Sequence, residues 1–446
     1  MDGLAGSRLA APDRLDRPFS DPLVAQLFPP LATGVHWGLE RTERALEALG
    51  KPHLSYRTLH VGGTNGKGSV VSTLSSVLNT AGTRTACFTS PHLCSFRERL
   101  LVGGEPLSEQ EILQCANDVR DVVMQFGLTF FEAITVLGLY AFARAGVEAA
   151  VLEVGLGGRL DATNVIRPDV AAVTNVAMDH AEYLGDTLEK IAREKAAIAK
   201  PGVPLVTAET SPALLAVFRE VAAGVGAPLV VVDPSSLGAV EVAADHTSFT
   251  LDTHTWGGMH VQTPLVGRHQ AVNAALAVKM LDVLPVELRP SAEAIREGIG
   301  AVEYHGRDQI VLVDGATWLL DVAHNTAGMR SLVDTIDRLD LPRPLVAVVG
   351  VLGDKDWRMM LPPLFSRTDV AFLTQPPSAP LDRRWSVAEA AAAVGTITHV
   401  VVEDDFERAL DRAKNEVGQG TIIVTGSVHT VGSALKILGL EPLGSR

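Results

Sequence analysis

The stretch that specifies the fold reads Thr58-Leu-His-Val-Gly-Gly-Thr-Asn-Gly-Lys-Gly-Ser69. A short β-prone run leads into a glycine-rich turn, and apolar side chains then recur at helical spacing from Ser69 to Thr80. A glycine-rich turn between a strand and a helix directs backbone N–H groups and a helix N-terminus toward an anion. The pattern therefore predicts a βα unit whose loop binds phosphate, with Lys67 as a further positive charge.

This loop departs from the common phosphate-loop motif G-x-x-x-x-G-K-[ST]. Val61 replaces the first glycine, and Gly68 stands where the hydroxyl residue is expected, with Ser69 one position later. The alternative is a glycine-rich turn that binds nothing. The strand-to-helix context and Lys67 favour phosphate binding over that alternative.

Strands and helices alternate along most of the chain, which is typical of a mostly parallel sheet covered by helices. We expect an α/β protein with two domains. Residues 1–299 would form a P-loop domain with a mostly parallel sheet and helices on both faces, and residues 300–446 a smaller Rossmann-like domain. An antiparallel section is expected over residues 229–263, a linker from Gly298 to Gly306, and a ligand cleft between the domains.

Composition restricts the possible partners. The 446 residues exceed the size of one hydrophobic core, and the formal net charge of −14 comes without any Lys/Arg-rich run, so nucleic-acid binding is not expected. The three cysteines form no C-x-x-C pair, which argues against a disulfide framework or a zinc site. No apolar run is long enough for a signal peptide or a membrane span. We expect a cytoplasmic protein without membrane contact.

Two charged residues stand where apolar ones are expected. Glu153 ends the apolar strand that starts at Ala149, where it either serves chemistry or caps the following loop. Lys195 falls on the apolar stripe of a helix that begins at Thr187; this stripe comprises Leu188, Ile191, Ala192, Ile198 and Ala199. Lys190 and Glu194 would form an i,i+4 pair on the opposite side. A buried Lys195 must pair with a carboxylate, extend its amine to solvent, or lose its charge chemically.

The loop and a series of further motifs resemble the folate branch of the Mur ligase superfamily, which comprises folylpolyglutamate and dihydrofolate synthases. The resemblance covers nearly the whole chain. The other motifs are, in order, Ser90-Pro-His92, Glu98-Arg99, Thr129-Phe-Phe-Glu132, Leu152 to Asn164, Thr174 to His180, Arg193-Glu-Lys195, His269-Gln270 with Asn273, Gly306-Arg307, and Asp321-Val-Ala-His-Asn325. Members of this family use ATP to convert a carboxylate into an acyl phosphate, which an amino acid then attacks, releasing ADP and phosphate.

The resemblance implies roles for individual residues. ATP would be bound by Gly63, Thr64, Asn65, Gly66, Lys67, Gly68, Ser69, Asn273, Arg307, Asp321 and His324. Ser90 and Glu153 would hold one Mg²⁺, and His180 with a carbamylated Lys195 a second, so that Lys67, Glu153, His180 and Lys195 are the catalytic set. Without the resemblance, His180 beside Asp179 would more often be a structural hydrogen bond than a metal ligand.

The resemblance also implies the substrates, which are ATP, dihydropteroate or a reduced folate, and L-glutamate. Phe131 and Asp161 would contact the pterin by stacking and by accepting hydrogen bonds. The chain departs from the family at Tyr304-His305, which precedes Gly306-Arg307, and at Thr326, because prolines are usual in both turns. We expect the protein to act as a monomer.

Two other functions are compatible with parts of the pattern. One is a cell-wall precursor ligase of the same superfamily, disfavoured because the phosphate loop begins near residue 62 and leaves no room for a preceding nucleotide-sugar domain. The other is a P-loop nucleotide-binding protein that has lost ligation, which the presence of Lys67, Glu153, His180 and Lys195 disfavours.

Overall fold

The computed structural model describes residues 21–31, 36–394 and 396–443 of the chain. The helices in this part are α1 (Val24–Leu27), α2 (Glu40–Ala48), α3 (Lys67–Thr80), α4 (Glu109–Gln125), α5 (Phe130–Arg144), α6 (Ala181–Leu184), α7 (Leu188–Ala196), α8 (Pro212–Val225), α9 (Arg268–Asp282), α10 (Ala292–Gly300), α11 (Thr326–Arg338), α12 (Trp357–Phe365), α13 (Val387–Val394), α14 (Phe406–Val417) and α15 (Val428–Leu438). The strands are β1 (Arg57–Gly62), β2 (Thr85–Phe88), β3 (Leu100–Val102), β4 (Glu105–Pro106), β5 (Ala149–Glu153), β6 (Val170–Val173), β7 (Leu205–Thr207), β8 (Leu229–Val231), β9 (Gly238–Val242), β10 (Thr247–Thr253), β11 (Gly257–Thr263), β12 (Gln309–Val313), β13 (Ala316–Leu320), β14 (Leu345–Val349), β15 (Val370–Leu373), β16 (His399–Val402) and β17 (Thr421–Thr425). The predicted phosphate loop lies between β1 and α3.

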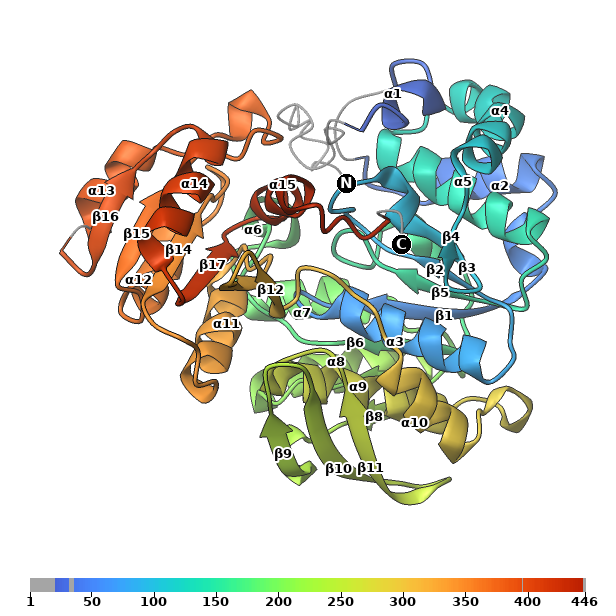
Figure 1. Cartoon of the computed structure of the whole chain (residues 1–446). Coiled ribbons are helices and arrows are strands. Elements are labelled where there is room, and N and C mark those ends of the chain that lie inside the picture. Colours follow the sequence, from blue (N-terminus) through green and yellow to red (C-terminus); the bar gives the residue numbers. More distant parts are fainter. Residues whose placement is uncertain (1–20, 32–35, 395, 444–446) are drawn as a thin grey trace, which may run out of the picture.

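An eight-stranded sheet forms the centre of the N-terminal part, in the order β4-β3-β2-β5-β1-β6-β7-β8 (Figure 1). The six strands from β2 to β8 in this order run parallel, whereas β3 and β4 add an antiparallel edge that the sequence did not predict. Because β2, β5, β1 and β6 are neighbours, the segments that follow these strands leave the sheet side by side. This edge of the sheet positions the candidate site.

Successive side chains of the central strands enter different cores, as expected for strands buried on both faces. Ala150 and Leu152 of β5 pack with α4 and α5, whereas Val151 between them packs with α3 and α9. On β6, Ala171 and Val173 pack with α7 and α8. Helices therefore cover both faces of the sheet, as predicted.

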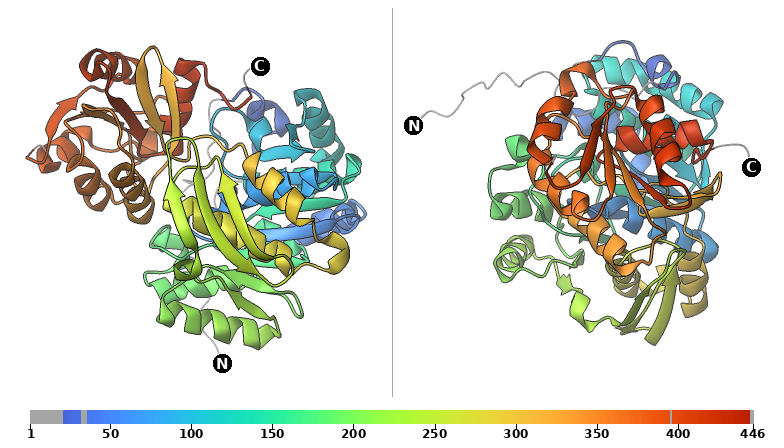
Figure 2. Two further views of the ribbon diagram at one scale, coloured as in Figure 1. Left: turned by 60° about the horizontal axis from the view of Figure 1, so that its bottom comes forward. Right: turned by 60° about the vertical axis from the view of Figure 1, so that its left-hand side comes forward.

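A small antiparallel sheet of order β11-β10-β9 packs on the side of α9 and α10 (Figure 2). The antiparallel section predicted over residues 229–263 is thus shorter, because β8 pairs parallel with β7 and extends the large sheet. The predicted linker also starts later. Gly298 lies inside α10, where an added Cβ would come within 2.4 Å of the Cα of Val77, so Gly298 allows α10 to approach α3. The irregular connection runs from residue 301 to 308.

The C-terminal part contains a six-stranded sheet of order β12-β13-β17-β14-β15-β16, in which β12 pairs antiparallel and the others parallel. Helices α11, α12 and α13 cover one face, and α14 and α15 cover the other (Figure 1). Cys94 from the N-terminal part joins the core beneath α15, where its Sγ lies 3.5 Å from the carbonyl oxygen of Gly432. The predicted α/β class is confirmed.

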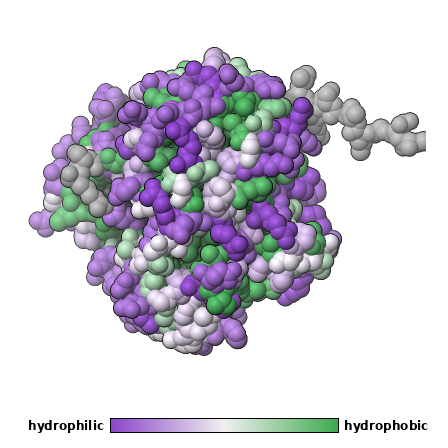
Figure 3. All heavy atoms as spheres, turned by 90° about the vertical axis from the view of Figure 1, so that its right-hand side faces the viewer, coloured by the Kyte–Doolittle hydropathy of each residue, from purple (hydrophilic) through white to green (hydrophobic). Residues whose placement is uncertain are grey.

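The surface is mixed in character. On the face drawn in Figure 3, hydrophilic residues predominate and hydrophobic residues form small separate groups. Within the described residues, none of the helices combines the length and the apolar character needed to cross a bilayer.

Candidate active site

A cavity of about 330 Å³ lies where the carboxyl edges of the two large sheets face each other. Its walls come from segments that follow β1, β2, β5 and β6 on one side and β13, β14 and β17 on the other. Every predicted site residue lines it, namely Gly63, Thr64, Asn65, Gly66, Lys67, Gly68, Ser69, Ser90, Phe131, Glu153, Asp161, His180, Lys195, Asn273, Arg307, Asp321 and His324. The fold therefore brings together residues that are spread over most of the sequence.

The segment after β6 fixes the phosphate loop. The backbone N–H of Thr64 donates to the carbonyl oxygen of Asn175 (2.9 Å), and Thr174 Oγ1 donates to the carbonyl oxygen of Asn65 (2.6 Å). Gly63 has a φ of 138°, and a Cβ there would lie only 1.8 Å from Thr174 Oγ1, so this position requires glycine. Contacts within the protein thus hold the loop backbone.

Helix α3 begins at Lys67, directly after Gly66 in the left-handed conformation. The first N–H groups of a helix lack intrahelical partners and favour an anion. Lys67 Nζ donates to the carbonyl oxygen of Thr64 (3.2 Å) and lies 3.8 Å from Glu153 Oε1. Ser69 Oγ is buried and has no hydrogen-bond partner in the structure. Donors and an unused hydroxyl therefore meet at one helix end, as polyphosphate binding requires.

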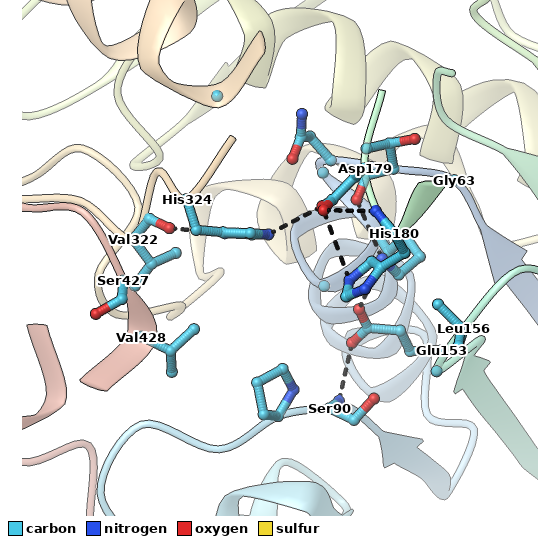
Figure 4. A pocket seen from close by; sticks show the side chains of 18 of the residues that line it. Gly63, Ser90, Glu153, Leu156, Asp179, His180, Val322, His324, Ser427 and Val428 are labelled. Carbon is cyan, nitrogen blue, oxygen red and sulfur yellow. Dashed lines mark hydrogen bonds and ion pairs between the residues drawn. The ribbon is translucent and has the colours of Figure 1, made fainter. Parts of the chain in front are cut away.

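Glu153 lies at the end of β5 and is only 4% exposed. Its Oε2 accepts a hydrogen bond from the backbone N–H of Ser90 (3.1 Å), as Figure 4 shows. Burial raises the pKa of Glu153, and the ammonium of Lys67 is the largest opposing influence. Neighbouring β2 and β5 thus bring Ser90 and Glu153 together, as the two residues predicted for one magnesium site require.

Lys195 is buried on α7, and its Nζ donates to the carbonyl oxygen of Gly63 (3.0 Å). Burial, and secondly the charge of Lys67, lower the pKa of Lys195 to about 7. A substantial fraction of the side chain is therefore a neutral amine near neutral pH. The predicted burial of Lys195 is confirmed, and its amine faces the phosphate loop.

Other parts of the prediction for this helix are wrong. Helix α7 ends at Ala196, so the buried Ile198 and Ala199 follow the helix, and Leu188 is 36% exposed. Lys190 and Glu194 do not pair with each other. Lys190 binds Asp186 at 2.7 Å, and Glu194 binds Arg159 at 3.0 Å, because each side chain has a nearer partner outside the helix.

Asp179 lies between side chains from both parts of the chain (Figure 4). Its carboxylate accepts hydrogen bonds from Lys355 Nζ (2.6 Å) and Asn325 Nδ2 (3.1 Å), and it lies 3.5 Å from His324 Nε2. His180 Nε2 is farther away, at 3.7 Å. The residue pair expected from the sequence is thus one part of a larger junction between the two sheets.

The junction leaves His180 as a neutral base. Burial, and secondly the charge of Lys355, lower the pKa of His180 to about 3. Its backbone adopts the left-handed conformation (φ 51°) at the start of α6. A neutral imidazole at the cavity wall has the protonation state that a metal ligand needs.

A second contact across the cavity joins the phosphate loop to α11. Asn325 caps α11 by accepting from the N–H of Gly328 (2.8 Å). The same side chain exchanges hydrogen bonds with Asn65, at 2.9 Å and 3.1 Å. The usual proline is absent at Thr326, but this cap and these bonds hold the turn.

Asn273, Arg307 and Asp321, which are predicted to bind the nucleotide, line the cavity together. A Cβ on Gly66 would come within 2.5 Å of Asn273 Oδ1, so the loop glycine lets Asn273 approach. Asp321 accepts from the backbone N–H groups of Ala323 (2.8 Å) and Asp308 (2.9 Å), which orient its carboxylate. The first contact links the phosphate loop to α9. The second links the end of β13 to the turn before β12.

Tyr304, which the sequence suggested only as a departure from the family, packs against two residues of the cavity wall, Gly68 and Arg307. Its hydroxyl lies over Gly68, where an added Cβ would come within 1.9 Å of the oxygen. The Arg307 guanidinium lies 4.9 Å from the centre of its ring, and Arg307 Nη2 is 3.4 Å from the hydroxyl. Tyr304 therefore packs between the phosphate loop and the predicted phosphate-binding arginine.

Phe131 and Asp161, which are predicted to contact the pterin, also line the cavity. Phe131 lies edge-on to Phe88, with centroids 6.4 Å apart, and against Gly155, where a Cβ would lie 2.2 Å from the ring. Asp161 accepts from Thr163 Oγ1 (2.5 Å) and from the N–H of Leu156 (2.8 Å), so it also organises its own loop. His36 and Trp37, which the sequence analysis did not name, line the cavity as well.

The donor set fits magnesium bound together with a nucleotide. Within the described residues, no group of three or more His, Cys, Asp and Glu side chains could hold a metal ion on its own. Mg²⁺, however, keeps several waters and takes one or two carboxylates together with phosphate oxygens. The carboxylate of Glu153 and the unpartnered Oγ of Ser69 supply oxygens beside the phosphate loop.

Comparison with known families and proteins gives a consistent result. The Mur ligase middle domain family matches residues 61–281, and the Mur ligase, glutamate ligase domain family matches residues 306–428. Folylpolyglutamate synthase of Lacticaseibacillus casei is 32% identical over 422 residues, covering 92% of this chain and 96% of the relative. Dihydrofolate synthase/folylpolyglutamate synthase of Escherichia coli is 33% identical over 417 residues, with 92% and 93% covered.

Solved structures are similar over the same extent. Mycobacterium tuberculosis folylpolyglutamate synthase complexed with ADP and AMPPCP superposes with a TM-score of 0.83 at 32% identity, covering 90% of this chain and 95% of that one. E. coli FolC in complex with DHPP and ADP gives a TM-score of 0.83 at 31% identity, with 94% and 99% covered.

Proposed function

Because the chain belongs to the folylpolyglutamate and dihydrofolate synthase family of Mur ligases, we propose that its cavity joins L-glutamate to dihydropteroate, to reduced folates, or to both, with ATP as co-substrate. The chain is an ATP-dependent ligase. The observation that supports a single reaction centre is the convergence of both sheet edges on one cavity that contains every predicted site residue.

ATP lies, in this proposal, along the wall from the phosphate loop to Asp321. The loop N–H groups, the start of α3 and Lys67 bind the phosphates, and Arg307 supplies a further positive charge from the opposite side of the cavity. Asn273 contacts adenine and Asp321 the ribose. Ser69, Ser90 and Glu153 provide oxygens for Mg²⁺, with His180 and Lys195 beside a second ion.

The reaction proceeds through an acyl phosphate. The pteroate carboxylate attacks the terminal phosphorus of ATP and ADP leaves; the glutamate amine then attacks the acyl carbon and phosphate leaves. When bound, Mg²⁺ neutralises negative charge on the phosphate oxygens. The protein positions the reactants, since Phe131 and Asp161 orient the pterin while Lys67 and Arg307 hold the phosphates.

We assign Lys195 as a carbamate. Its neutral amine adds CO₂ and releases a proton, which converts a buried cation into an anion with two oxygens. The low pKa of about 7, caused first by burial, makes this addition feasible near neutral pH. An anion beside the phosphate loop and near His180 suits a magnesium site, whereas an ammonium would repel the ion.

A coupled assay of phosphate release tests the function. Phosphate release should require ATP, a pteroate or folate, and L-glutamate together, and the substrate panel should contain dihydropteroate, tetrahydrofolate and several amino acids. ATP hydrolysis that is independent of both other substrates would instead indicate a nucleotide-binding protein without ligation.

Substitutions of Lys195 test the carbamate. Lys195→Ala should abolish ligation, and acetate should restore part of it by placing oxygens in the vacated space. Lys195→Arg should stay inactive because a guanidinium stays charged and does not form a carbamate. In ¹³C-labelled bicarbonate, the wild type should show a carbamate resonance that Lys195→Ala lacks, while Lys190→Ala, an exposed change on the same helix, should retain it. Full activity in Lys195→Arg would overturn the assignment.

We also propose that the domains are residues 1–299 and 300–446, and that the protein acts as a monomer in the cytoplasm. The separate sheets on either side of residues 301–308 support the division, and a single chain contains every predicted site residue. Cys87, Cys94 and Cys115 are free and buried, which suits a reducing compartment. Light scattering of the purified protein measures its molar mass in solution and so tests whether it is a monomer.

A further inference from the structure

Asp308 is a buried carboxyl group at the cavity wall for which the proposed reaction has no use. It is 1% exposed and lies in the turn between Arg307 and β12 with a φ of 45°, in the left-handed region. Its Oδ2 accepts a hydrogen bond from Thr335 Oγ1 (2.6 Å). Its Oδ1 is also buried but accepts no hydrogen bond in the structure. A buried carboxylate oxygen without a donor is costly, so the group needs an explanation.

The carboxyl group of Asp321 supplies that explanation. The backbone N–H of Asp308 donates to Asp321 Oδ2 (2.9 Å), which brings two buried acidic residues together, and the negative charge of Asp321 raises the pKa of Asp308. Two ionised carboxylates this close repel each other, whereas one shared proton converts the repulsion into a hydrogen bond. The unpaired Oδ1 of Asp308 is the oxygen available to carry this proton.

The other charged groups near the pair do not remove the need for a proton. His269 Nε2 lies 4.0 Å from Asp308 Oδ2, and burial lowers the pKa of His269, so its ring is neutral. The positive charge of Arg307 lowers the pKa of Asp308, but this effect is smaller than the effects of burial and of Asp321, which raise it. Asp334 faces His269 and adds further negative charge. Burial and the Asp321 carboxylate together raise the pKa of Asp308 well above its usual range.

We propose that Asp308 is a neutral carboxylic acid whose O–H donates to Asp321, and that this bond holds the Asp321 carboxylate in place to accept a ribose hydroxyl of the nucleotide. A carboxylate has about four acceptor positions. The N–H groups of Asp308 and Ala323 and the acid proton of Asp308 occupy three, which leaves one for the ligand. Asp308 is thus a positioning residue, and this role rests on the proposed nucleotide-binding function of Asp321.

Asp308→Asn tests the proposal most directly. The asparagine side chain has the shape of the aspartic acid, but its N–H₂ group is a hydrogen-bond donor at every pH. The amide oxygen accepts from Thr335, the amide N–H₂ donates to Asp321, and asparagine tolerates the left-handed backbone. Asp308→Gly tolerates the same backbone but removes the donor. Affinity for ADP is measured by calorimetry for the wild type and both variants from about pH 6 to about pH 10.

The wild type should bind ADP well at low pH and lose affinity as the pH rises through the raised pKa of Asp308. Asp308→Asn should bind as tightly as the low-pH wild type and show no such decline. Asp308→Gly should bind ADP about tenfold more weakly than the low-pH wild type, and its affinity should not change with pH. A tenfold loss is the effect of losing one hydrogen bond to a charged group. 2′- and 3′-deoxy-ADP should reveal which hydroxyl depends on Asp308, since the decline should disappear for the analogue that lacks it.

An Asp308→Asn protein that declines with pH like the wild type, or that binds as weakly as Asp308→Gly, overturns the proposal. Two measurements separate this failure from a failure of the nucleotide site. If Asp321→Asn leaves ADP affinity unchanged, Asp321 does not bind the ribose and the assignment of the nucleotide wall is wrong. The melting temperature without ligand tests the shared proton independently of nucleotide binding. Folded Asp308 retains a proton that the unfolded chain releases. The stability of the wild type should therefore fall more steeply with rising pH than that of Asp308→Asn. Parallel melting curves would show that no proton is shared.

Discussion

Lys67 connects the phosphate loop to the buried carboxylate of Glu153. Its Nζ donates to a loop carbonyl and lies 3.8 Å from Glu153 Oε1. Burial raises the pKa of Glu153, and Lys67 opposes that effect more than any other group does. In the proposed site, a single side chain therefore supplies charge to the phosphates and also favours the ionised form of the carboxylate proposed to bind magnesium.

Lys67→Ala should lower turnover by about 100-fold or more, as the loss of one electrostatic contact to a transition state does. The melting temperature should change little, since the loop is held by backbone bonds to the segment after β6. Steady-state phosphate release and thermal melting measure the two effects, with Lys190→Ala as an exposed control. Turnover close to the wild-type rate in a folded variant would remove the loop from the mechanism.

Single residues could be predicted from the sequence where they violate a local pattern. Glu153 ends an apolar strand and Lys195 lies on an apolar helix face, and both are buried in the cavity. Asp179 and Lys355 carried no such signal, because the residues are 176 positions apart and their bond depends on how the two sheets face each other. The Lys190–Glu194 pair was predicted wrongly for the converse reason. Helical spacing permits the contact, but both side chains pair with residues outside α7, Lys190 with Asp186 just before the helix and Glu194 with Arg159.

At the scale of elements, the start of α3 and the connection between α10 and β12 form one unit. Tyr304 from the connection covers Gly68 in the first turn of α3 and contacts Arg307. Gly298 in α10 packs directly on Val77 of α3. The geometry of the helix end proposed to bind phosphate therefore depends on a segment more than 200 residues away in sequence.

Gly68→Ala should weaken ADP binding and lower activity, because the new Cβ meets the Tyr304 hydroxyl at 1.9 Å and one of the two must move. Gly68→Ala with Tyr304→Leu should recover ADP binding but not turnover, since Arg307 would lose its partner. Gly224→Ala is the matched control: it lies in α8 with no atom within 4 Å of the added Cβ, and there the change should be neutral or slightly stabilising. Unchanged ADP affinity in Gly68→Ala would contradict the packing argument.

The order of helices and strands was largely predictable, because hydrophobic periodicity and glycine turns mark individual elements. The pairing of the strands was harder to predict from the sequence. The sequence assigned β8 to an antiparallel section, but β7 offers it a parallel edge that no local pattern reveals. Likewise, Gly298 resembles a linker glycine in sequence, while its role is the close approach of two helices.

For the whole molecule, the Asp179 junction determines how the two large sheets meet. Lys355 Nζ and Asp179 form an ion pair at 2.6 Å in which both side chains are less than a tenth exposed. Asn325 joins the same carboxylate and the phosphate loop. These polar contacts and the apolar packing of Cys94 beneath α15 join the two parts of the chain around the cavity.

Lys355→Met should lower stability by up to about 3 kcal/mol, since removing one partner leaves a buried carboxylate with fewer donors. It should also speed proteolytic cleavage within residues 301–308 and weaken ADP binding, because the two sheets would separate more readily. Lys51→Met breaks an exposed pair with Glu47 and serves as the control with little effect. Thermal melting, timed proteolysis and calorimetry measure the three outcomes. A Lys355→Met protein with wild-type proteolysis and affinity would show that the junction does not hold the two sheets together.

The strand order of the C-terminal sheet has a consequence for synthesis of the chain. β17 is the last strand made, yet it lies between β13 and β14 and pairs with both. On the ribosome, β12 to β16 therefore emerge before the strand that unites them, whereas all strands of the large sheet are available once Val231 has emerged. A nascent chain can assemble the phosphate loop early but can complete the opposite wall of the cavity only after residue 425. Premature termination before that point would yield a protein with a phosphate loop and no enclosed site, exposing apolar edges that chaperones and proteases recognise.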